Sequence, residues 1–319
     1  MGLLDDVRRS CALVAARAVH VRIATERLPA YAAALPLDRL ARPTLDPTAH
    51  YLADEAGTVA YILTLDTINF GSGWFPLLRK RPGRSGYFTI ALALKEAFER
   101  EGPWDAAALR TMTSERCAAV FGQDPDLPLM PLFAQALRDY GQLLHDRYGD
   151  DPRRLVASAE GSAERLVQQL LALPFYRDVA RYAGQPVAFY KRAQLAAADL
   201  ALALSQLTPP SPLGAFRDLH RLTIFADNLV PHVLRLDGVL QYAPALLARI
   251  EAEQPLEPGS PEEVEIRACA VHAVELLVAE LARQGHRVTA HQLDYLLWNR
   301  GQEPRYKTRP RHRARTVFY

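Results

Sequence analysis

Apolar residues recur every three or four positions over most of the chain, a spacing that places them on one face of an α-helix. The runs are rich in alanine and leucine, which favour helices. They cover residues of about 3–20, 86–101, 105–120, 131–147, 162–173, 188–207, 215–226 and 243–253. The pattern therefore predicts a mainly α-helical protein.

A long helix near residues 261–284 is predicted from the residues at its two ends. Ser260 can cap its first turn, and Glu263 can return a hydrogen bond to the backbone of Ser260, which is the capping-box arrangement. Pro261 suits the first helical position, and Gly285 follows the last one. Both ends of this helix are thus marked in the sequence.

A shorter helix is predicted between Thr289 and Gly301 by similar signals. Gln292 completes a capping box with Thr289, and Gly301 ends the helical pattern. Tyr295 and Asn299 are four positions apart and would share one face. The helix would also carry Asp294 and Trp298.

One stretch departs from the helical pattern. Residues 59–65 are rich in β-branched and aromatic residues, and residues 71–73 read Gly-Ser-Gly. This predicts one short strand or hairpin near 59–75. Asp66 would end the strand, with Asn69 just beyond it, where side chains often project into a site. Alternatively, Asp66 bonds to the backbone of its own turn.

The chain of 319 residues is long enough for one domain with a full hydrophobic core. Residues 207–214 contain three prolines, which cannot continue a helix, and are the best candidate for a linker. We therefore expect a single domain over 1–319, or two packed lobes at about 1–206 and 215–319.

Composition and charge indicate a soluble globular protein, with 49% hydrophobic residues, 23% charged residues and a net charge of +2. In the first 20 residues, acids and arginines precede an apolar run that is too short for a signal peptide or a membrane span. The expected location is the cytoplasm, without membrane attachment.

No cofactor or metal is expected. Cys11, Cys117 and Cys269 are far apart, so neither a disulfide framework nor a thiolate zinc site is indicated. The sequence contains no GxGxxG, GKS/T or HExxH motif, which removes the usual signs of a nucleotide cofactor or a zinc protease.

Asp227, in the stretch LTIFADNLVPHVL, has two interpretations. An aspartate shortly before a proline often caps a helix. Its flanks, however, include Ile224, Phe225 and Leu229. Such apolar surroundings raise a carboxyl pKa or focus a negative field on a developing cation, as a catalytic carboxylate requires.

Further candidates are basic residues at a helix start. Lys191 and Arg192 oppose the helix dipole there, which a bound phosphate would reconcile, unless both side chains extend into solvent. Asp199 lies on roughly the same face among alanine and leucine, where it needs a partner. His50 lies in a loop and alone indicates nothing specific.

The last 17 residues carry six lysines and arginines. Taken alone they are typical of a nucleic-acid-binding tail. The segment nevertheless closes on Val317, Phe318 and Tyr319, an apolar end that suits docking on the fold.

Several of these pieces together resemble the queuosine salvage proteins. They are DTINF, YKRAQ, FADNLVPHVL, IRACAVHAVELL, LDYLLWN and the arginine-rich aromatic end, which occur in this order over about residues 45–319. The resemblance implies an N-glycosylase that hydrolyses queuosine 5'-phosphate and releases queuine for reuse in tRNA modification. It also implies a compact helical fold similar to helix-hairpin-helix DNA glycosylases.

The same resemblance assigns residues by motif. Asp227 matches the catalytic aspartate, and Phe225 matches an aromatic residue that contacts the base. The remaining matches are binding positions, namely His50, Asp294, Tyr295 and Asn299. The family also carries aspartate at the position of Asn299 and commonly tyrosine at that of Asn228, so the charge there differs among members.

The implied chemistry agrees with these residue types. Breaking an N-glycosidic bond develops positive charge on the ribose, which a carboxylate such as Asp227 stabilises or attacks. Queuine is a 7-deazaguanine and cannot be protonated at N7, so its other edge must be recognised, for which Asp294 is suited. Lys191, with Arg192, is our candidate for the 5'-phosphate.

Two other functions remain open. A helix-hairpin-helix-like DNA or RNA glycosylase, or a nucleic-acid-binding protein, is suggested by the implied fold and the basic end, although the modest net charge argues against a stable nucleic-acid partner. A non-catalytic helical scaffold would require every candidate residue to be structural.

Overall fold

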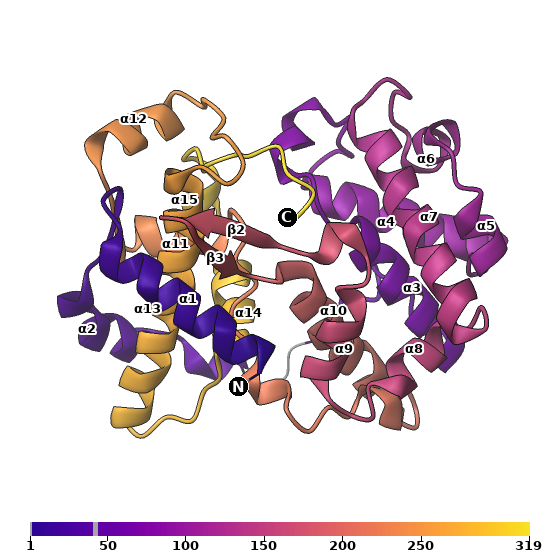
Figure 1. The fold of residues 1–319 in the computed structure, drawn as a ribbon, viewed down its shortest axis with the longest axis horizontal. Coiled ribbons are helices and arrows are strands. Elements are labelled where there is room, and N and C mark those ends of the chain that lie inside the picture. The colour runs from indigo at the N-terminus through magenta and orange to yellow at the C-terminus, as the bar shows by residue number, and fades with distance from the viewer. Residues whose placement is uncertain (1, 41–43) are drawn as a thin grey trace. The chain divides into compact units, whose positions relative to one another are not determined.

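Helices make up most of the computed structural model, which describes residues 2–40 and 44–319 (Figure 1). The prediction of a mainly α-helical protein is confirmed. The helices are α1 Leu3–Arg17, α2 Leu28–Ala33, α3 Glu55–Ile68, α4 Gly86–Glu101, α5 Ala106–Arg110, α6 Ser114–Phe121, α7 Leu129–Tyr148, α8 Pro152–Ser158, α9 Ala163–Leu170, α10 Lys191–Ser205, α11 Val230–Leu236, α12 Pro244–Glu251, α13 Pro261–Arg283, α14 Ala290–Arg300 and α15 Pro304–Lys307.

The strands in the described part of the chain form two short antiparallel pairs. β1 (Val21–Ile23) pairs with β4 (Leu240–Tyr242), with residue 22 opposite residue 241. β2 (Val179–Tyr182) pairs with β3 (Gln185–Ala188), with residue 180 opposite residue 187. Neither pair includes the region where the sequence predicted a strand.

The chain divides into two units. The first comprises residues 1–43, 178–191 and 220–316, and the second comprises residues 44–177, 192–219 and 317–319. The predicted linker at 207–214 lies inside the second unit, where Ser211 donates a hydrogen bond of 2.6 Å to Glu55. A single domain over the whole chain stays a prediction.

Helix α13 is central to the core of the first unit, where α1, α2 and β1 contact it. Its apolar side chains, among them Val264, Val271 and Leu277, are buried. The predicted cap is confirmed, since the Ser260 hydroxyl accepts the Glu263 N–H. The Glu263 carboxylate reaches the N–H of Gly259, at 3.2 Å, one residue earlier than expected.

The second unit is built around α3, which contacts α4, α7 and α8. The prediction of a strand or hairpin near 59–75 is wrong, because residues 55–68 are helical and residues 72–77 form a 3-10 helix. Every residue from Gly57 to Ile68 is buried. A helix buried on all sides is apolar on all sides, so it lacks the periodicity by which helices are recognised. Its start is fixed by Asp54, which accepts the Gly57 N–H at 2.8 Å.

Two predicted helices also differ from the structure. The helix at 105–120 is broken into α5 and α6, since Thr113 caps a new helix by accepting the Arg116 N–H. The helix at 215–226 is replaced by a 3-10 turn at 219–221 and an extended segment. The backbone of that segment makes hydrogen bonds with the side chains of Asp294 and Arg267. These tertiary hydrogen bonds take the place of the hydrogen bonds within a helix.

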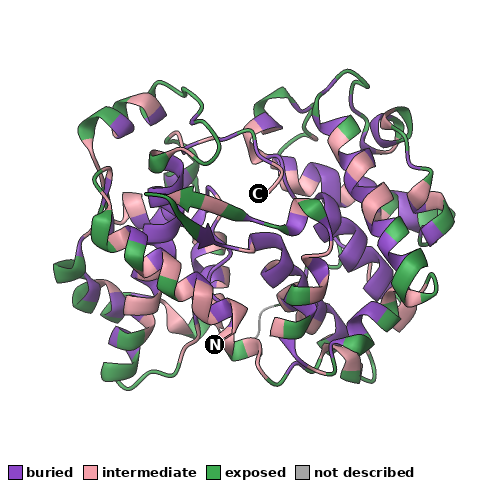
Figure 2. Ribbon diagram, viewed as in Figure 1, coloured by how far each residue is buried: buried purple, intermediate pink, exposed green. Residues whose placement is uncertain are grey.

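Buried positions follow the inner faces of the helices, and exposed positions gather on outer turns and loops (Figure 2). The three cysteines are all buried, and burial raises the pKa of Cys117 and of Cys269 to about 12, which disfavours the reactive thiolate form. Within the described part of the chain, no helix is both long enough and apolar enough to cross a membrane.

Candidate functional site

Asp227 lies in the first unit, in the extended segment that leads into α11. Its Oδ1 accepts hydrogen bonds from the backbone N–H groups of Leu229, at 2.7 Å, and Val230, at 3.2 Å. Pro231 occupies the first turn of α11. Asp227 thus bonds to the backbone of the turn that leads into α11, whose N-cap residue is Leu229. Its Oδ2 makes no hydrogen bond to any residue that the structure describes.

This arrangement is compatible with a catalytic carboxylate. Two N–H groups at a helix start hold one oxygen and thereby fix the orientation of the whole group. Asp227 is half-buried, and the neighbouring Ile224, Phe225 and Leu229 are buried. Apolar surroundings screen a charge poorly, so Asp227 acts strongly on groups beside it.

Asp294 lies close to this segment, on α14, and is only 5% exposed. Its Oδ1 accepts the backbone N–H of Phe225 at 2.8 Å. Burial and the negative charge of Asp227 raise the pKa of Asp294 to about 7, although the bond from Phe225 and the positive charge of Lys191 lower it. The structure thus brings Asp227, Phe225, Asp294 and Lys191 together in one unit.

Two basic side chains act on this pair of carboxyl groups. Lys191, the first residue of α10, is 6% exposed, and its charge acts on Asp294. Arg311 is half-buried; burial lowers its pKa and the charge of Asp227 opposes that shift. Negative and positive groups therefore act on one another in a largely buried region.

Tyr295 and Asn299 occupy successive turns of α14, as predicted from their spacing. The Asn299 side chain donates a hydrogen bond of 2.9 Å to the backbone carbonyl of Tyr295. Tyr295 is half-buried and Asn299 is exposed. The predicted capping box of this helix is also confirmed, with Thr289 donating its N–H to Gln292 at 3.0 Å.

The second unit holds another group of candidates around Tyr87. His50 is buried, and its ring nitrogens are 2.9 Å from the carbonyl of Asp46 and 2.8 Å from the Tyr87 hydroxyl. Burial lowers the pKa of His50 and raises that of Tyr87, and the charges of Asp199 and Asp66 raise the pKa of Tyr87 further. His50 therefore contacts Tyr87, and the charges of Asp66 and Asp199 act on the same tyrosine.

Asp66 and Asn69 do not follow a strand, as the sequence suggested. Asp66 is fully buried within α3, and Asn69 caps the end of that helix. The Asn69 amide donates to Asp66 Oδ1 at 3.3 Å. The expectation for the surroundings of these two residues was wrong because the strand prediction was wrong.

Arg192 is 1% exposed, and its guanidinium lies within the second unit. It donates to four backbone carbonyl oxygens, those of Asp66, Thr67, Phe175 and Val317. The guanidinium carbon of Arg192 also lies 4.8 Å from the ring centroid of Phe70 and 4.5 Å from that of Tyr176. These contacts favour a structural role for Arg192 over phosphate binding.

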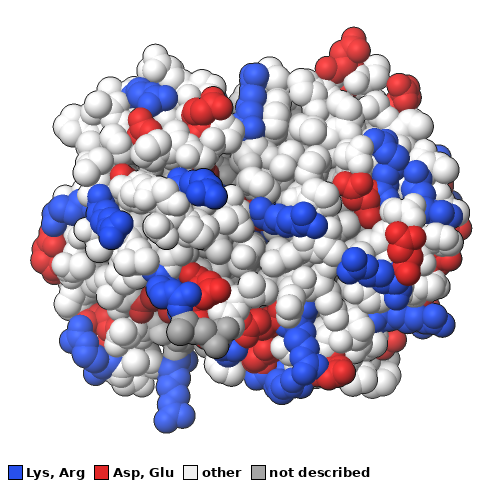
Figure 3. Space-filling view, viewed as in Figure 1, with Lys and Arg blue, Asp and Glu red and all other residues white. Residues whose placement is uncertain are grey.

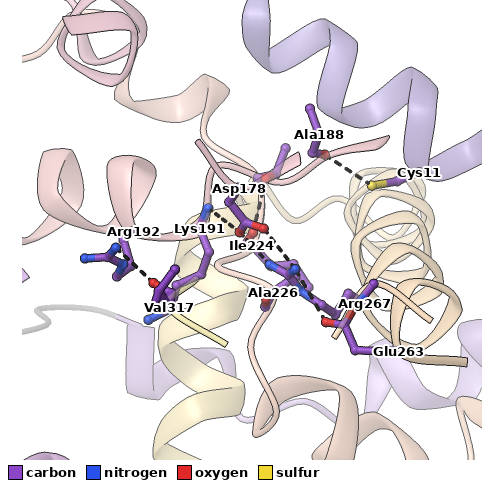
Figure 4. A network of polar contacts seen from close by, with 12 residues as sticks. Cys11, Asp178, Ala188, Lys191, Arg192, Ile224, Ala226, Glu263, Arg267 and Val317 are labelled. Atoms are coloured by element: carbon purple, nitrogen blue, oxygen red, sulfur yellow. Dashed lines mark hydrogen bonds and ion pairs between the residues drawn. The ribbon is translucent and has the colours of Figure 1, made fainter. Parts of the chain in front are cut away.

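Asp178 and Arg267 were not among the residues chosen from the sequence. Arg267, on α13, makes a bidentate ion pair with Asp178, and both side chains are buried (Figure 4). Asp178 also accepts the backbone N–H of Lys191 at 3.2 Å. An arginine within the apolar run IRACAVHAVELL was a usable signal, since a buried cation requires an acidic partner.

The basic C-terminal segment is packed on the fold. Arg305 pairs with Asp237 at 3.1 Å and Arg313 with Glu253 at 2.7 Å. Residue 314 forms a parallel bridge with residue 256 in the first unit. In the second unit Tyr319 is 2% exposed, and its carbonyl accepts the N–H of Gly71 at 2.9 Å. The docking interpretation is confirmed.

The candidate residues divide between the units. The first holds Lys191, Phe225, Asp227, Asp294, Tyr295 and Asn299, and the second holds His50, Asp66, Asn69, Arg192 and Asp199. Over residues 2–40 and 44–319, no three His, Cys, Asp or Glu side chains are grouped so as to hold a metal ion.

Known proteins resemble the chain over most of its length. The family model described as queuosine salvage protein matches residues 49–319. A protein of Sphaerobacter thermophilus is 39% identical over 100% of this chain and 98% of its own. One of Dictyostelium discoideum is 35% identical over 82% of this chain and 78% of its own, and one of Mus musculus is 31% identical over 84% and 83%.

All three relatives carry the name queuosine 5'-phosphate N-glycosylase/hydrolase. The family match includes α10, the segment with Asp227, α13 and α14. These elements contain the pieces on which the sequence resemblance was based. The chain belongs to the queuosine salvage protein family.

Proposed function

We propose that this protein is a nucleotide N-glycosidase that hydrolyses queuosine 5'-phosphate and releases queuine. The observation that carries the proposal is that Asp227, before α11, and Asp294, on α14, lie close together within the part of the chain that the family model matches. The relatives that bear the name of this activity match 100% and 82% of this chain. We place the reaction in the cytoplasm, without a cofactor and without a stable nucleic-acid partner.

Asp227 is the proposed catalytic carboxylate. As the bond between the ribose and the base breaks, its electrons leave with the base and positive charge develops on the ribose. A carboxylate held in apolar surroundings stabilises this charge without having to reorganise. Direct attack of water and a covalent glycosyl intermediate both use this carboxylate.

Asp294 is the proposed partner of the leaving base. Its pKa of about 7 leaves both protonation states populated near neutral pH. The ionised form accepts hydrogen bonds from N–H groups of the base, whereas the neutral form can donate one. Phe225 and Tyr295 offer aromatic faces to the base, and Asn299 and His50 stay proposed binding residues from the family motif.

Lys191 is the proposed ligand of the 5'-phosphate. It combines a cationic side chain with a position at the N-terminus of a 15-residue helix, and both attract an anion. Arg192 is assigned instead to holding backbone carbonyls, because its hydrogen bonds and ring contacts occupy the guanidinium.

Replacing Asp227 by asparagine tests the central assignment. The asparagine oxygen can still accept the Leu229 N–H, so the melting temperature should change little, whereas the negative charge is lost. Queuine release from queuosine 5'-phosphate, measured by chromatography, should fall by about three orders of magnitude.

Asp105 provides a matched control for this substitution. It caps α5 by accepting the Ala108 N–H at 2.7 Å and lies in the second unit. Asp105→Asn should retain wild-type turnover. Near-wild-type turnover by Asp227→Asn would remove Asp227 from the mechanism.

A further inference from the structure

We propose that Arg267 positions Asp227 by holding the peptide group directly before it. Arg267 Nε donates a hydrogen bond of 2.9 Å to the carbonyl oxygen of Ala226. The inference rests on the proposed function, since it gives Arg267 a role only through Asp227. Figure 4 shows the guanidinium between Ala226, Asp178 and Glu263.

The guanidinium plane is itself fixed on several sides. The two terminal nitrogens of Arg267 donate hydrogen bonds to the Asp178 carboxylate at 3.0 Å and 2.5 Å, and Glu263 lies 3.6 Å from one of these nitrogens. The guanidinium carbon lies 3.9 Å from the ring centroid of Phe189. A planar group held by a bidentate ion pair and an aromatic face cannot turn, so the direction of its Nε–H is set.

The segment before Asp227 depends on such side chains. Residues 222–226 are in neither a helix nor a strand. Their buried polar backbone groups therefore need other partners. Asp294 accepts the N–H of Phe225 and Arg267 donates to the carbonyl of Ala226. Two side chains from α14 and α13 thus fix the two residues that precede Asp227.

The residues after Asp227 are fixed as well. Its own Oδ1 bonds to the N–H groups of Leu229 and Val230, which start α11. The backbone is consequently held on both sides of the carboxylate. A loss of the Arg267 bond should shift the carboxylate and leave the rest of the site in place.

Asp178 links the same ion pair to α10. Its Oδ2 accepts the backbone N–H of Lys191, and its carbonyl accepts the N–H groups of Phe189, at 2.9 Å, and Tyr190, at 3.3 Å. Tyr190 has a positive φ of 50°, a conformation that needs such support. Asp178 therefore supports the start of α10 through contacts of its own, which a change at Arg267 leaves in place.

Arg267→Lys tests the positioning role. Lysine keeps a positive charge beside Asp178 but cannot bond to Asp178 and Ala226 with one rigid plane. With queuosine 5'-phosphate we expect kcat to fall about 100-fold while KM changes less than about threefold, because a misplaced carboxylate affects the transition state rather than substrate binding.

Glu263→Gln is the matched control. It removes the charge of Glu263, whose Oε1 lies 3.6 Å from Arg267 Nη1, beyond hydrogen-bond distance, so the hydrogen bonds of Arg267 to Asp178 and Ala226 stay in place. We expect a lower melting temperature with kcat close to that of the wild type. If folded Arg267→Lys protein keeps a kcat within about threefold of the Glu263→Gln protein, the positioning role is overturned.

Phe189→Leu supplies a second test should the lysine variant fail to fold. It removes the ring under the guanidinium without removing a charge or a hydrogen bond. We expect kcat to fall about fivefold with KM unchanged, because the Nε–H can then tilt away from Ala226. An unchanged kcat in this variant would also overturn the positioning role.

The test separates the two proposals when Asp227→Asn is assayed alongside. Wild-type protein that releases no queuine from queuosine 5'-phosphate contradicts the proposed function itself, and an active Asp227→Asn protein contradicts the catalytic role of Asp227. An inactive Asp227→Asn protein together with fully active Arg267→Lys protein contradicts only the role of Arg267. In the Asp227→Asn background, Arg267→Lys should lower the residual single-turnover rate no further, because residues that act as a unit are not additive.

Discussion

At the scale of single residues, Asp227 and Asp294 lie close together but have different surroundings. Asp227 receives two N–H groups at a helix start and keeps a second oxygen without a hydrogen bond from the described residues. Asp294 is buried beside the charge of Asp227, which favours its neutral form. This difference is the basis on which we propose Asp227 as the group that stabilises the ribosyl cation and Asp294 as the partner of the leaving base.

Asp294 should make the stability of the protein depend on pH. Its pKa is about 7 in the folded protein. In the unfolded chain an aspartate has a pKa of about 3.9. Between these values the unfolded chain has released a proton that the folded protein retains, so the free energy of unfolding should decrease as pH rises, by on the order of a few kcal/mol in total.

Asp294→Asn should remove this decrease. The amide is neutral at every pH and its oxygen can still accept the Phe225 N–H. Urea unfolding of both proteins at pH 5 and at pH 8 measures how far the free energy of unfolding changes between these two pH values. The charged groups around Asp294 are Asp227 and Lys191, and both remain in the variant. Equal pH dependence in the two proteins would contradict the raised pKa.

At the scale of elements, local signals were sufficient for α13 and α14. Their caps involve residues within four positions of one another, so the sequence contains the whole interaction. Helix α3 was missed because it is buried on all sides, so its apolar residues show no helical periodicity in the sequence. The segment at 222–226 was missed because its partners, Arg267 and Asp294, are 41 and 69 residues away from the backbone atoms they bind.

The start of α10 leads to a prediction about substrate selection. Lys191 places a cation at a helix N-terminus, where N–H groups and the dipole also favour an anion. Lys191→Ala should raise KM for queuosine 5'-phosphate about tenfold or more and should hardly affect cleavage of unphosphorylated queuosine. Steady-state kinetics on the two substrates gives the comparison.

Lys95 is the control for that substitution. It lies in the second unit and pairs with Glu99 at 2.5 Å on the surface of α4, so Lys95→Ala should leave both substrates unaffected. Equal losses on both substrates in Lys191→Ala would remove Lys191 from phosphate binding.

At the scale of the whole molecule, the division into units could not be predicted from composition. Each unit takes segments from distant parts of the chain, and residues 178–191 and 317–319 belong to a different unit from their neighbours. Prolines at 207–214 mark the end of a helix rather than a boundary between units. The family could nevertheless be recognised from the sequence, because its motifs are identified by their order along the chain and not by where the units begin and end. The implied likeness to helix-hairpin-helix glycosylases stays a prediction.

The distribution of charge leads to the last prediction, which concerns nucleic acids. The net charge is +2, and on the face drawn in Figure 3 basic and acidic side chains are interspersed. Arg305 and Arg313 of the basic segment are paired with acids. Binding to DNA or tRNA through phosphates releases counterions and therefore weakens steeply with salt. Such binding needs several unpaired cations on one surface.

Titrations of labelled duplex DNA and tRNA at about 50 mM and 200 mM salt should therefore show no specific binding, with a basic DNA-binding protein as the positive control. Tight binding that weakens by about 1,000-fold between these salt concentrations would instead favour a glycosylase that acts on nucleic acid.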